Sequence, residues 1–470
     1  MSKISSMLDI GKRSLSNSQT ALQTVSHNIA NKSTEGFSRQ RVEIMTNAPD
    51  MPGQLQIGNG ARAGLITRTN NPWLEKQIQR EGTNLGYSDA RADALARVEQ
   101  VYNEQNNKGL NQYMTDFFNG FREMSANPES LAGRTMVREA GVALTNDFKR
   151  VVGQLKDVQE DLDHQITSTV DEVNQITKEI ADLNMKIKMV EVQGTPSNDD
   201  RDRRDLLLKK LGEKLEVNWA EGNDGMVSVT AGRAAVLVSG LDSTDLKIHK
   251  IGEENGTQIF YSATKNGTEF NMTDHFRGGR IGAALEVRDE TIKGLLGHVD
   301  NLAFNFANSV NEAHSQGFDR YGQAGANFFE MPEDVSGAAG NLAINQDVFS
   351  DVGRIAAAAR PNAPGDNTVA NMISSLQNRK TMNNGEASFD DYYNTQVGQI
   401  GSVTSRAVKT MESQKNIMQQ LGNLRESISG VSLDEETTKM IEFQKAYDAS
   451  ARLIRTADEM FDTILNLKRL

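Results

Sequence analysis

The N-terminal segment has apolar residues at the spacing of an amphipathic helix. Four of them recur every seven residues and one lies on the adjoining row, and these five are Leu8, Leu15, Leu22, Val25 and Ile29. Heptad spacing places such residues on one face of a helix, where they can pack against partner helices. Gly11 and Ser18 fall between them, so a neighbouring helix can approach closely there. The pattern ends at Asn28-Ile29-Ala30-Asn31, and Gly36 marks the turn that follows.

The C-terminal segment repeats this pattern. Ser432-Leu433-Asp434-Glu435 has the form of a capping box, and no helix breaker follows between residues 433 and 470. Apolar residues then alternate steps of three and four, and those expected at an interface are Met440, Phe443, Tyr447, Ile454, Phe461 and Ile464. Both chain ends are therefore predicted to be amphipathic helices with coiled-coil spacing.

Between the two ends the pattern changes several times. Helix-type spacing is found over residues 71–152, 155–190, 292–310 and 389–429. Residues 213–285 instead place β-branched and aromatic residues between Gly, Asn and Asp turns, which is typical of strands. The fold class predicted is multidomain and mainly α, with long coiled-coil-like helices from both chain ends and an inserted β-rich domain.

The chain of 470 residues is too long for one hydrophobic core, so several domains are expected. A terminal helical assembly domain is predicted over residues 1–60 and 431–470. A central helical-rod domain is predicted over residues 61–200, 286–316 and 366–430. An inserted β-rich outer domain is predicted over residues 201–285 and 317–365.

Composition and charge give no sign of a catalytic or nucleic-acid site. The 51 basic and 63 acidic residues leave a net charge of −12, whereas a protein that binds nucleic acid needs a basic face. There is no cysteine, no apolar run long enough for membrane insertion, and no h-region of a cleavable secretory signal. The six histidines are not spaced as metal ligands usually are, so we expect no catalytic residue, cofactor or metal.

Residues 199–205 form a cluster of alternating acidic and basic side chains. Four aspartates alternate with three arginines, and the seven residues are Asp199, Asp200, Arg201, Asp202, Arg203, Arg204 and Asp205. Paired carboxylates can do acid–base chemistry. We favour the alternative, in which the interleaved arginines hold the carboxylates ionised in a salt-bridge network at a helix start.

The two terminal stripes need more neighbours than each other, because one antiparallel helix pair is only marginally stable. Either the central helices of this chain supply these neighbours, or other subunits do. Since the stripes lie at the two termini, we favour other subunits.

The stretch "SHNIANKSTEGFSRQR" resembles the N-terminal signature of the bacterial flagellar axial proteins, the family of rod, hook and hook-associated proteins. The matching residues are Asn28, Asn31, Thr34, Gly36, Phe37 and Arg39. The C-terminal stretch "SLDEETTKMIEFQKAYDASARLIRTADEMFDTILNL" is close to the C-terminal signature of the same family. Ser38-Arg39-Gln40 and the internal segments "DRDRRDLLLKKL" and "GGRIGAALEVRDETI" are similar to its hook-associated branch.

The resemblance implies a structural subunit, not an enzyme, at the junction between flagellar hook and filament. It implies that the two stripes pair in the core of a tube and that the Asn-Ile-Ala-Asn turn directs the chain outward. Asn tolerates left-handed geometry there, and Gly36 supplies a positive φ. The implied partners are further copies of the chain, the hook protein, a second hook-associated protein on the filament side and an export chaperone.

The resemblance also implies export through the flagellar type III apparatus to an extracellular position. Two alternatives stay open. One is another axial subunit, of hook or filament type. The other is a secreted wall hydrolase with axial-type ends, whose site would have to lie within residues 201–285.

Overall fold

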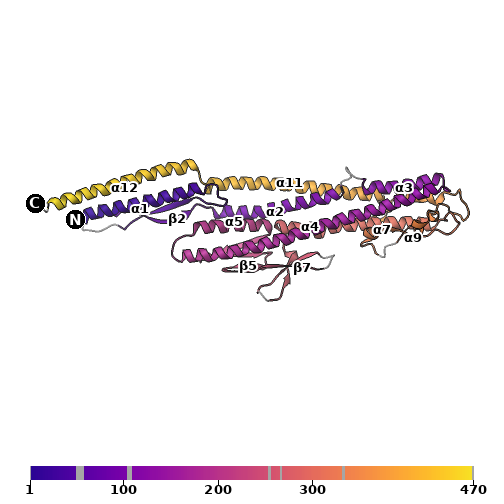
Figure 1. Ribbon diagram of the computed structural model, residues 1–470, viewed down its shortest axis with the longest axis horizontal. Helices are drawn as coiled ribbons and strands as arrows, with labels where there is room; N and C mark the ends of the chain where they lie inside the picture. Colours follow the sequence, from indigo (N-terminus) through magenta and orange to yellow (C-terminus); the bar gives the residue numbers. More distant parts are fainter. Residues whose placement is uncertain are drawn as a thin grey trace.

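The computed structural model describes residues 2–48, 58–102, 108–251, 256–264, 267–330 and 334–467. The molecule is elongated, with long helices running along its length and both termini at the same end (Figure 1). A small group of strands projects from one side near the middle. The predicted fold class is confirmed: the chain is mainly α, with long terminal helices and a small inserted β region.

Long helices build the rod. They are α2 (Pro72–Val101), α3 (Leu110–Ala126), α4 (Leu131–Glu191), α5 (Asn198–Lys214), α6 (Gly279–Glu286), α7 (Lys293–Ser315) and α11 (Phe389–Ser429). A six-residue π-helix, Val287–Ile292, joins α6 to α7. Asn71 caps α2 by accepting hydrogen bonds from the backbone N–H groups of Trp73 and Leu74, and Pro72 occupies the first turn, where its missing N–H is not needed.

Helix α4 is the longest element and the backbone of the rod. Its 61 residues extend well beyond the predicted segment 155–190, because the interrupted pattern upstream of Val152 belongs to the same helix. At about 1.5 Å per residue it is roughly 90 Å long. Leu155, Leu162 and Ile166 point into the core as their spacing predicts.

The inserted strands form two antiparallel sheets beside α4. The first has the order β3 (Val217–Glu221), β4 (Val227–Ala231), β5 (Ala235–Ser239), β6 (Asp242–Ser243). The second has the order β7 (Leu246–Lys250), β8 (Thr257–Tyr261), β9 (Phe270–Asn271). Asn174 of α4 exchanges hydrogen bonds of 2.8 and 2.9 Å with the backbone of Leu246, which fixes the second sheet on the rod.

The end of the rod far from the termini is closed by short elements. They are β10 (Phe329–Glu330), α8 (Ala338–Asn341), β11 (Ala343–Ile344), α9 (Gln346–Ser350) and α10 (Thr368–Ser375), with 3-10 turns at 352–354, 376–378 and 383–385. An aromatic cluster holds this end together, and its rings are Phe117, Phe121, Phe306, Phe328, Phe329 and Phe389.

Two segments pack against different parts of the chain from those that the sequence predicts. Residues 317–365 do not join the strands of 213–285. They pack on α4 and α7 at the far end, because the rings of Phe328 and Phe329 complete the aromatic cluster there. Residues 61–68 form β2 (Ala61–Arg68), which pairs with β1 (Gln40–Thr46) and so belongs with the N-terminal segment instead of the rod.

The hydrophobic core follows the rod. One large cluster of buried apolar side chains extends from Ala92 of α2 to Ala407 of α11, and a small second cluster joins Leu74, Ile78 and Leu421. In the described part of the chain, neither cluster includes a residue of α1 (Ser2–Ala30) or α12 (Leu433–Leu467). The two terminal helices therefore stand outside the core of the rod.

Candidate functional site

The terminal helices α1 and α12 pack against each other as an antiparallel pair (Figure 1). The hydroxyl oxygens of Ser14 and Ser450 are 2.7 Å apart. A Cβ placed on Gly11 would lie 2.8 Å from Cγ1 of Ile454, so the two helices approach more closely than a larger residue would allow. Small buried residues on the two helices include Gly11, Ser18, Ala21, Ser450 and Ala457. The expected close approach is thus present at Gly11.

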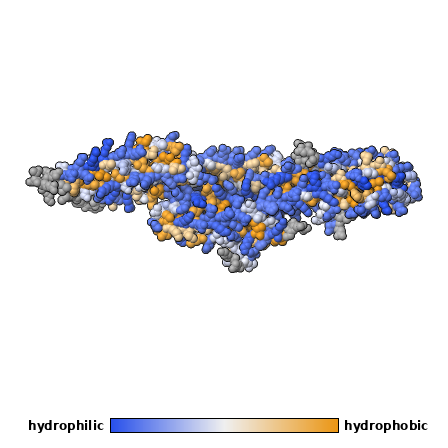
Figure 2. Space-filling model, viewed as in Figure 1, coloured by the Kyte–Doolittle hydropathy of each residue, from blue (hydrophilic) through white to orange (hydrophobic). Residues whose placement is uncertain are grey.

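The predicted apolar interface residues lie around this seam and remain partly open. Val25 is buried, whereas eight others are half-buried: Leu8, Leu15, Leu22, Ile29, Met440, Phe443, Ile454 and Phe461. Tyr447 and Ile464 are exposed. Figure 2 shows apolar residues at the surface along these helices, between hydrophilic ones. The pair alone therefore covers its stripes incompletely.

A β-hairpin covers a second side of α1. Asn17 donates to the carbonyl oxygen of Ala61 at 2.9 Å and accepts from the N–H of Ala63 at 2.7 Å. Arg13 donates to the carbonyl oxygen of Asn59 at 3.0 Å. We call α1, the β1–β2 hairpin and α12 together the terminal unit. The rod helices are not among the main contacts of α1 and α12.

The residues of the predicted turn motif follow α1 directly. Gly36 has φ +83°, so its predicted positive φ is confirmed. Neither Asn28 nor Asn31 uses the left-handed geometry that Asn tolerates, since neither has a positive φ. Asn31 instead donates to the carbonyl oxygen of His27 and accepts from the hydroxyl of Thr34. The ring of Phe37 packs edge-on against His27, with centroids 5.5 Å apart.

Asn28 is part of a buried polar cluster that we call the terminal joint: Asn28, Arg39, Gln40 and Glu436. Asn28 accepts from the N–H of Gln40 at 3.0 Å and donates to its carbonyl oxygen at 2.9 Å. It also donates to the carboxylate of Glu436 at 2.9 Å. Arg39 donates to the same carboxylate from Nε at 2.8 Å, and its Nη2 lies 2.6 Å from the same oxygen as an ion pair. The joint connects the end of α1 to the start of α12.

The positive charge of Arg39 and the negative charge of Glu436 neutralise each other within the terminal joint. Burial alone would lower the pKa of Arg39, but its hydrogen bonds to Glu436 and Glu435 outweigh burial and raise it. Arg39 therefore stays a guanidinium, and the carboxylate of Glu436 is opposed by a fixed positive charge.

The other side of the turn is attached to the rod. The N–H of Ser38 donates to Asp202 of α5 at 2.8 Å, and the N–H of Arg39 donates to the carbonyl oxygen of Ser429, the last residue of α11, at 2.9 Å. Arg425 donates to the carbonyl oxygen of Gly36 at 3.0 Å and pairs with Glu75 at 3.0 Å. The turn thus lies between the terminal unit and two rod helices, α5 and α11.

The aspartates of 199–205 do not pair with the interleaved arginines, so that prediction is wrong. Asp202 and Asp205 both contact Arg68 of β2, at 2.9 and 2.6 Å. Arg204 points the other way and donates to Asn184 and to the carbonyl oxygen of Gly225. Residues one or two apart on a helix face different directions, so an alternating run splits between two sides of α5.

The environment of Asp202 acts on its pKa in two directions. Burial raises its pKa above the ordinary value, and the hydrogen bonds from Ser38 and Arg68 only partly oppose this. The donors to the Asp202 carboxylate are a backbone N–H and a guanidinium group of the protein itself. Asp202 therefore has a structural role at the base of the turn.

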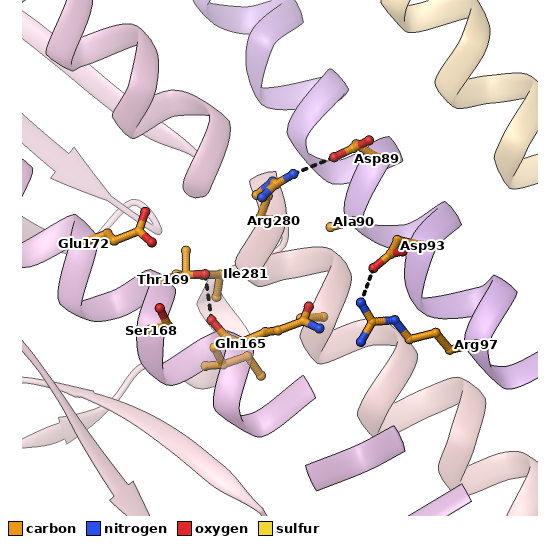
Figure 3. A pocket seen from close by; sticks show the side chains of 12 residues that line it. Asp89, Ala90, Asp93, Arg97, Gln165, Ser168, Thr169, Glu172, Arg280 and Ile281 are labelled. Atoms are coloured by element: carbon orange, nitrogen blue, oxygen red, sulfur yellow. Dashed lines mark hydrogen bonds and ion pairs between the residues drawn. The ribbon is translucent and has the colours of Figure 1, made fainter. Parts of the chain in front are cut away.

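A polar surface pocket lies between α2, α4 and α6 (Figure 3). Its charged side chains are already paired: Arg280 with Asp89 at 2.6 Å, Arg97 with Asp93 at 2.8 Å, and Glu172 with Lys214. Such mutual neutralisation leaves little charge directed at a ligand. This pocket therefore does not compete with the terminal unit as the functional site.

The described residues contain neither a metal-binding cluster nor a membrane-spanning helix. Within the described part of the chain, no three His, Asp or Glu side chains gather to hold a metal ion. None of the described helices has both the length and the apolarity of a membrane span.

Glu436 and Arg425 are residues of this region that the sequence patterns did not single out. Glu436 follows the capping box and looks like a solvent-facing charge in the first turn of a helix. The available signal was its spacing: Glu436, Met440 and Phe443 follow steps of four and three, which puts the carboxylate on the apolar face of α12.

Two protein families match parts of the chain. The family described as flagellar hook-associated protein FlgK helical domain matches residues 95–329, half of the 470 residues. The family described as flagellar basal body rod FlgEFG protein C-terminal matches residues 425–467, which include the whole of α12.

Individual proteins match over nearly the full length. The chain is 29% identical to flagellar hook-associated protein 1 of Bacillus subtilis (strain 168), over 98% of this chain and 97% of the relative. It is 24% identical to flagellar hook-associated protein 1 of Escherichia coli (strain K12), over 99% of this chain and 100% of the relative. Among solved structures, it is similar to the flagellar hook junction protein FlgK from Burkholderia pseudomallei. The TM-score is 0.69 at 15% identity, covering 75% of this chain and 100% of that one, which shows a shared fold.

Proposed function

The chain belongs to the flagellar hook-associated protein FlgK family, and on this premise we propose that it is a structural subunit joining the flagellar hook to the filament. It is a component of the bacterial flagellum. Its position at the hook–filament junction and its extracellular location are part of the proposal.

The incompletely covered terminal unit is the observation that best supports an assembly role. Its helices stand outside both hydrophobic clusters of the rod, and most of their predicted interface residues are half-buried. Burying apolar surface contributes about 25 cal/mol per Å², so partly open stripes gain free energy when neighbouring copies cover them. We propose that these stripes contact other copies, the hook protein on one side and a second hook-associated protein on the other.

The three parts of the molecule take different roles in this proposal. The terminal unit is the assembly domain. The rod from α2 to α11 is a stiff spacer, because one continuous cluster of buried side chains runs along it. The strands β3 to β9 project from the rod and form an outer domain (Figure 1).

Export is the second part of the proposal. We propose that the chain passes through the flagellar type III apparatus unfolded, and that a chaperone covers the apolar face of α12 beforehand. A chain without cysteine forms no disulfide that would obstruct unfolding. A terminal unit outside the core of the rod can separate from it without opening that core.

We propose no enzymatic activity. The relatives are flagellar hook-associated proteins by name, and Asp202 and Asp205 are bound to Arg68 in the base of the turn. The alternative of a hook or filament subunit is opposed by the match of residues 95–329 to the hook-associated family.

Complementation of a strain that lacks the gene tests the assembly role. The substitution Leu22→Asp places a charge on the half-buried stripe, and Gln23→Asp places the same charge on the next, exposed residue of α1. We expect Leu22→Asp to leave intact hooks without filaments and filament subunits in the medium, with the purified variant still folded. Gln23→Asp should restore filaments. Filaments in both strains would contradict the proposal.

A further inference from the structure

Glu436 brings a carboxylate into the contact between α1 and α12. Its side chain is 1% exposed, whereas that of the preceding Glu435 is 61% exposed. One oxygen of Glu436 accepts from Asn28, and the other accepts from Nε of Arg39, whose Nη2 lies at ion-pair distance from it. This buried carboxylate therefore has a hydrogen-bond partner at each oxygen.

Such an arrangement is not needed to hold two helices together. Replacing a buried ion pair by apolar residues is often neutral for stability or even favourable. What buried polar residues do supply, with coiled-coil Asn the best-attested case, is a single alignment of two helices.

The polar contact between Ser14 and Ser450 does not by itself fix an alignment. Small residues lie on both helices, Gly11, Ser14 and Ser18 on α1 and Ser450 on α12. Ser14 and Ser18 are one turn apart, so a slip of one turn would let Ser18 replace Ser14 as the partner of Ser450. This hydroxyl contact can be remade after a slip and does not define a single register.

We propose that Glu436 is a positioning residue that fixes the axial register of α12 on α1. Its two partners are themselves fixed. Asn28 is bound to the backbone of Gln40 at both of its polar groups, and the N–H of Arg39 is bound to the end of α11. The axial position of α12 on α1 is thereby fixed relative to the rod, and with it the axial position of the apolar stripes. That consequence for assembly rests on the proposed function, but the register itself does not.

Engineered disulfides can report the register, because the chain has no cysteine of its own. Ser14→Cys with Ser450→Cys reports the native register, since these hydroxyls are 2.7 Å apart. Ser18→Cys with Ser450→Cys, and Ser14→Cys with Ala446→Cys, report slips of one turn in the two directions. Each needs a shift of about 6 Å along the axis, and a disulfide requires Cα atoms within about 7 Å.

The monomer is oxidised with each cysteine pair in three backgrounds: wild type, Glu436→Leu and Glu435→Leu. We expect Glu436→Leu to raise the ratio of slipped to native crosslinks by on the order of tenfold, the effect of losing one or more charge-assisted hydrogen bonds. Glu435→Leu is the matched control, since it removes the neighbouring, exposed carboxylate that also pairs with Arg39, and should leave the ratio unchanged. Glu436→Gln, which retains an acceptor, should fall between them.

An unchanged ratio in Glu436→Leu would overturn the proposal. So would the loss of every crosslink, because Glu436 would then be required for pairing and not for alignment. A second arm separates this inference from the proposed function. Glu436→Leu should weaken the joining of hook to filament, because it misplaces the stripes. The oxidised Ser14→Cys/Ser450→Cys pair in the same background should restore that joining. Failure of Leu22→Asp to block joining would instead count against the assembly role.

Discussion

Asn28 and Glu436 are hydrogen-bonded at 2.9 Å although 408 positions separate them in the sequence. Asn28 lies in the last turn of α1 and Glu436 in the first turn of α12, and both are 1% exposed. This bond closes the two ends of the chain into one unit beside the rod. The terminal unit therefore has a defined structure before any neighbour is added, while its apolar stripes stay partly open.

The substitution Asn28→Ala should loosen the terminal unit without affecting the rod. It removes both bonds to Gln40 and leaves Glu436 without its amide donor, and a buried group left unpaired costs about 1–3 kcal/mol. We expect amide exchange in α1 and α12 to become about tenfold to a hundredfold faster, with α4 unchanged. The control is Asn31→Ala, whose side chain bonds within the half-exposed turn and should change exchange much less.

Periodicity was enough to predict the long helices and their faces. Helix α11 was predicted over 389–429 and is Phe389–Ser429, because Ser388 caps it and Gly430 ends it. The β-rich segment was also predicted, since strands β3 to β9 all fall within 213–285. These features depend on near neighbours in the sequence, which local spacing records.

Partners across the fold could not be predicted in the same way. Asp202 alternates with arginines in sequence but is bound by Ser38 and Arg68, which local spacing does not bring together. Residues 317–365 look like loops for an outer domain, and only the three-dimensional position of Phe328 and Phe329 assigns them to the end of the rod.

Hydrogen exchange of the free monomer should separate the terminal unit from the rod. Residues 155–190 contribute to the large buried cluster, whereas α1 and α12 belong to neither cluster. Local opening requires less free energy where fewer apolar contacts are lost. We expect amides of α1 and α12 to exchange faster than those of 155–190 and to be the first sites of proteolysis. Equal protection across the two regions would contradict this.

The closeness of α1 and α12 predicts opposite effects of two Gly→Ala substitutions. Ala is favoured over Gly within a helix by about 1 kcal/mol. At Gly153 of α4 a new Cβ meets nothing within 4 Å, so Gly153→Ala should slow amide exchange around it. At Gly11 the Cβ would lie 2.8 Å from Ile454 and 3.1 Å from Leu453, so Gly11→Ala should push the helices apart. Exchange in α12 should then become faster, and slower exchange there would show that the seam is loosely packed.

His314 is fully buried near the end of α7 and has two backbone partners. Its Nδ1 donates to the carbonyl oxygen of Ala326 at 2.6 Å, and its Nε2 accepts from the N–H of Ala356 at 2.8 Å. A second proton would sit on Nε2, facing that N–H. Burial lowers the pKa of His314 to about 4, which the hydrogen bond to Ala326 only partly opposes.

Stability of the rod should therefore fall as the pH is lowered from 7 to 4.5. In this interval the unfolded chain, with an ordinary histidine pKa near 6.5, binds a proton that the folded chain excludes, so protonation favours unfolding. The shift corresponds to a loss of about 2–3 kcal/mol from this side chain. Urea unfolding at the two pH values measures it in wild type, His314→Gln and His164→Gln, the last removing an exposed histidine of α4. We expect His314→Gln alone to lose less stability on acidification than wild type does, and an equal loss would show that His314 titrates normally in the folded chain.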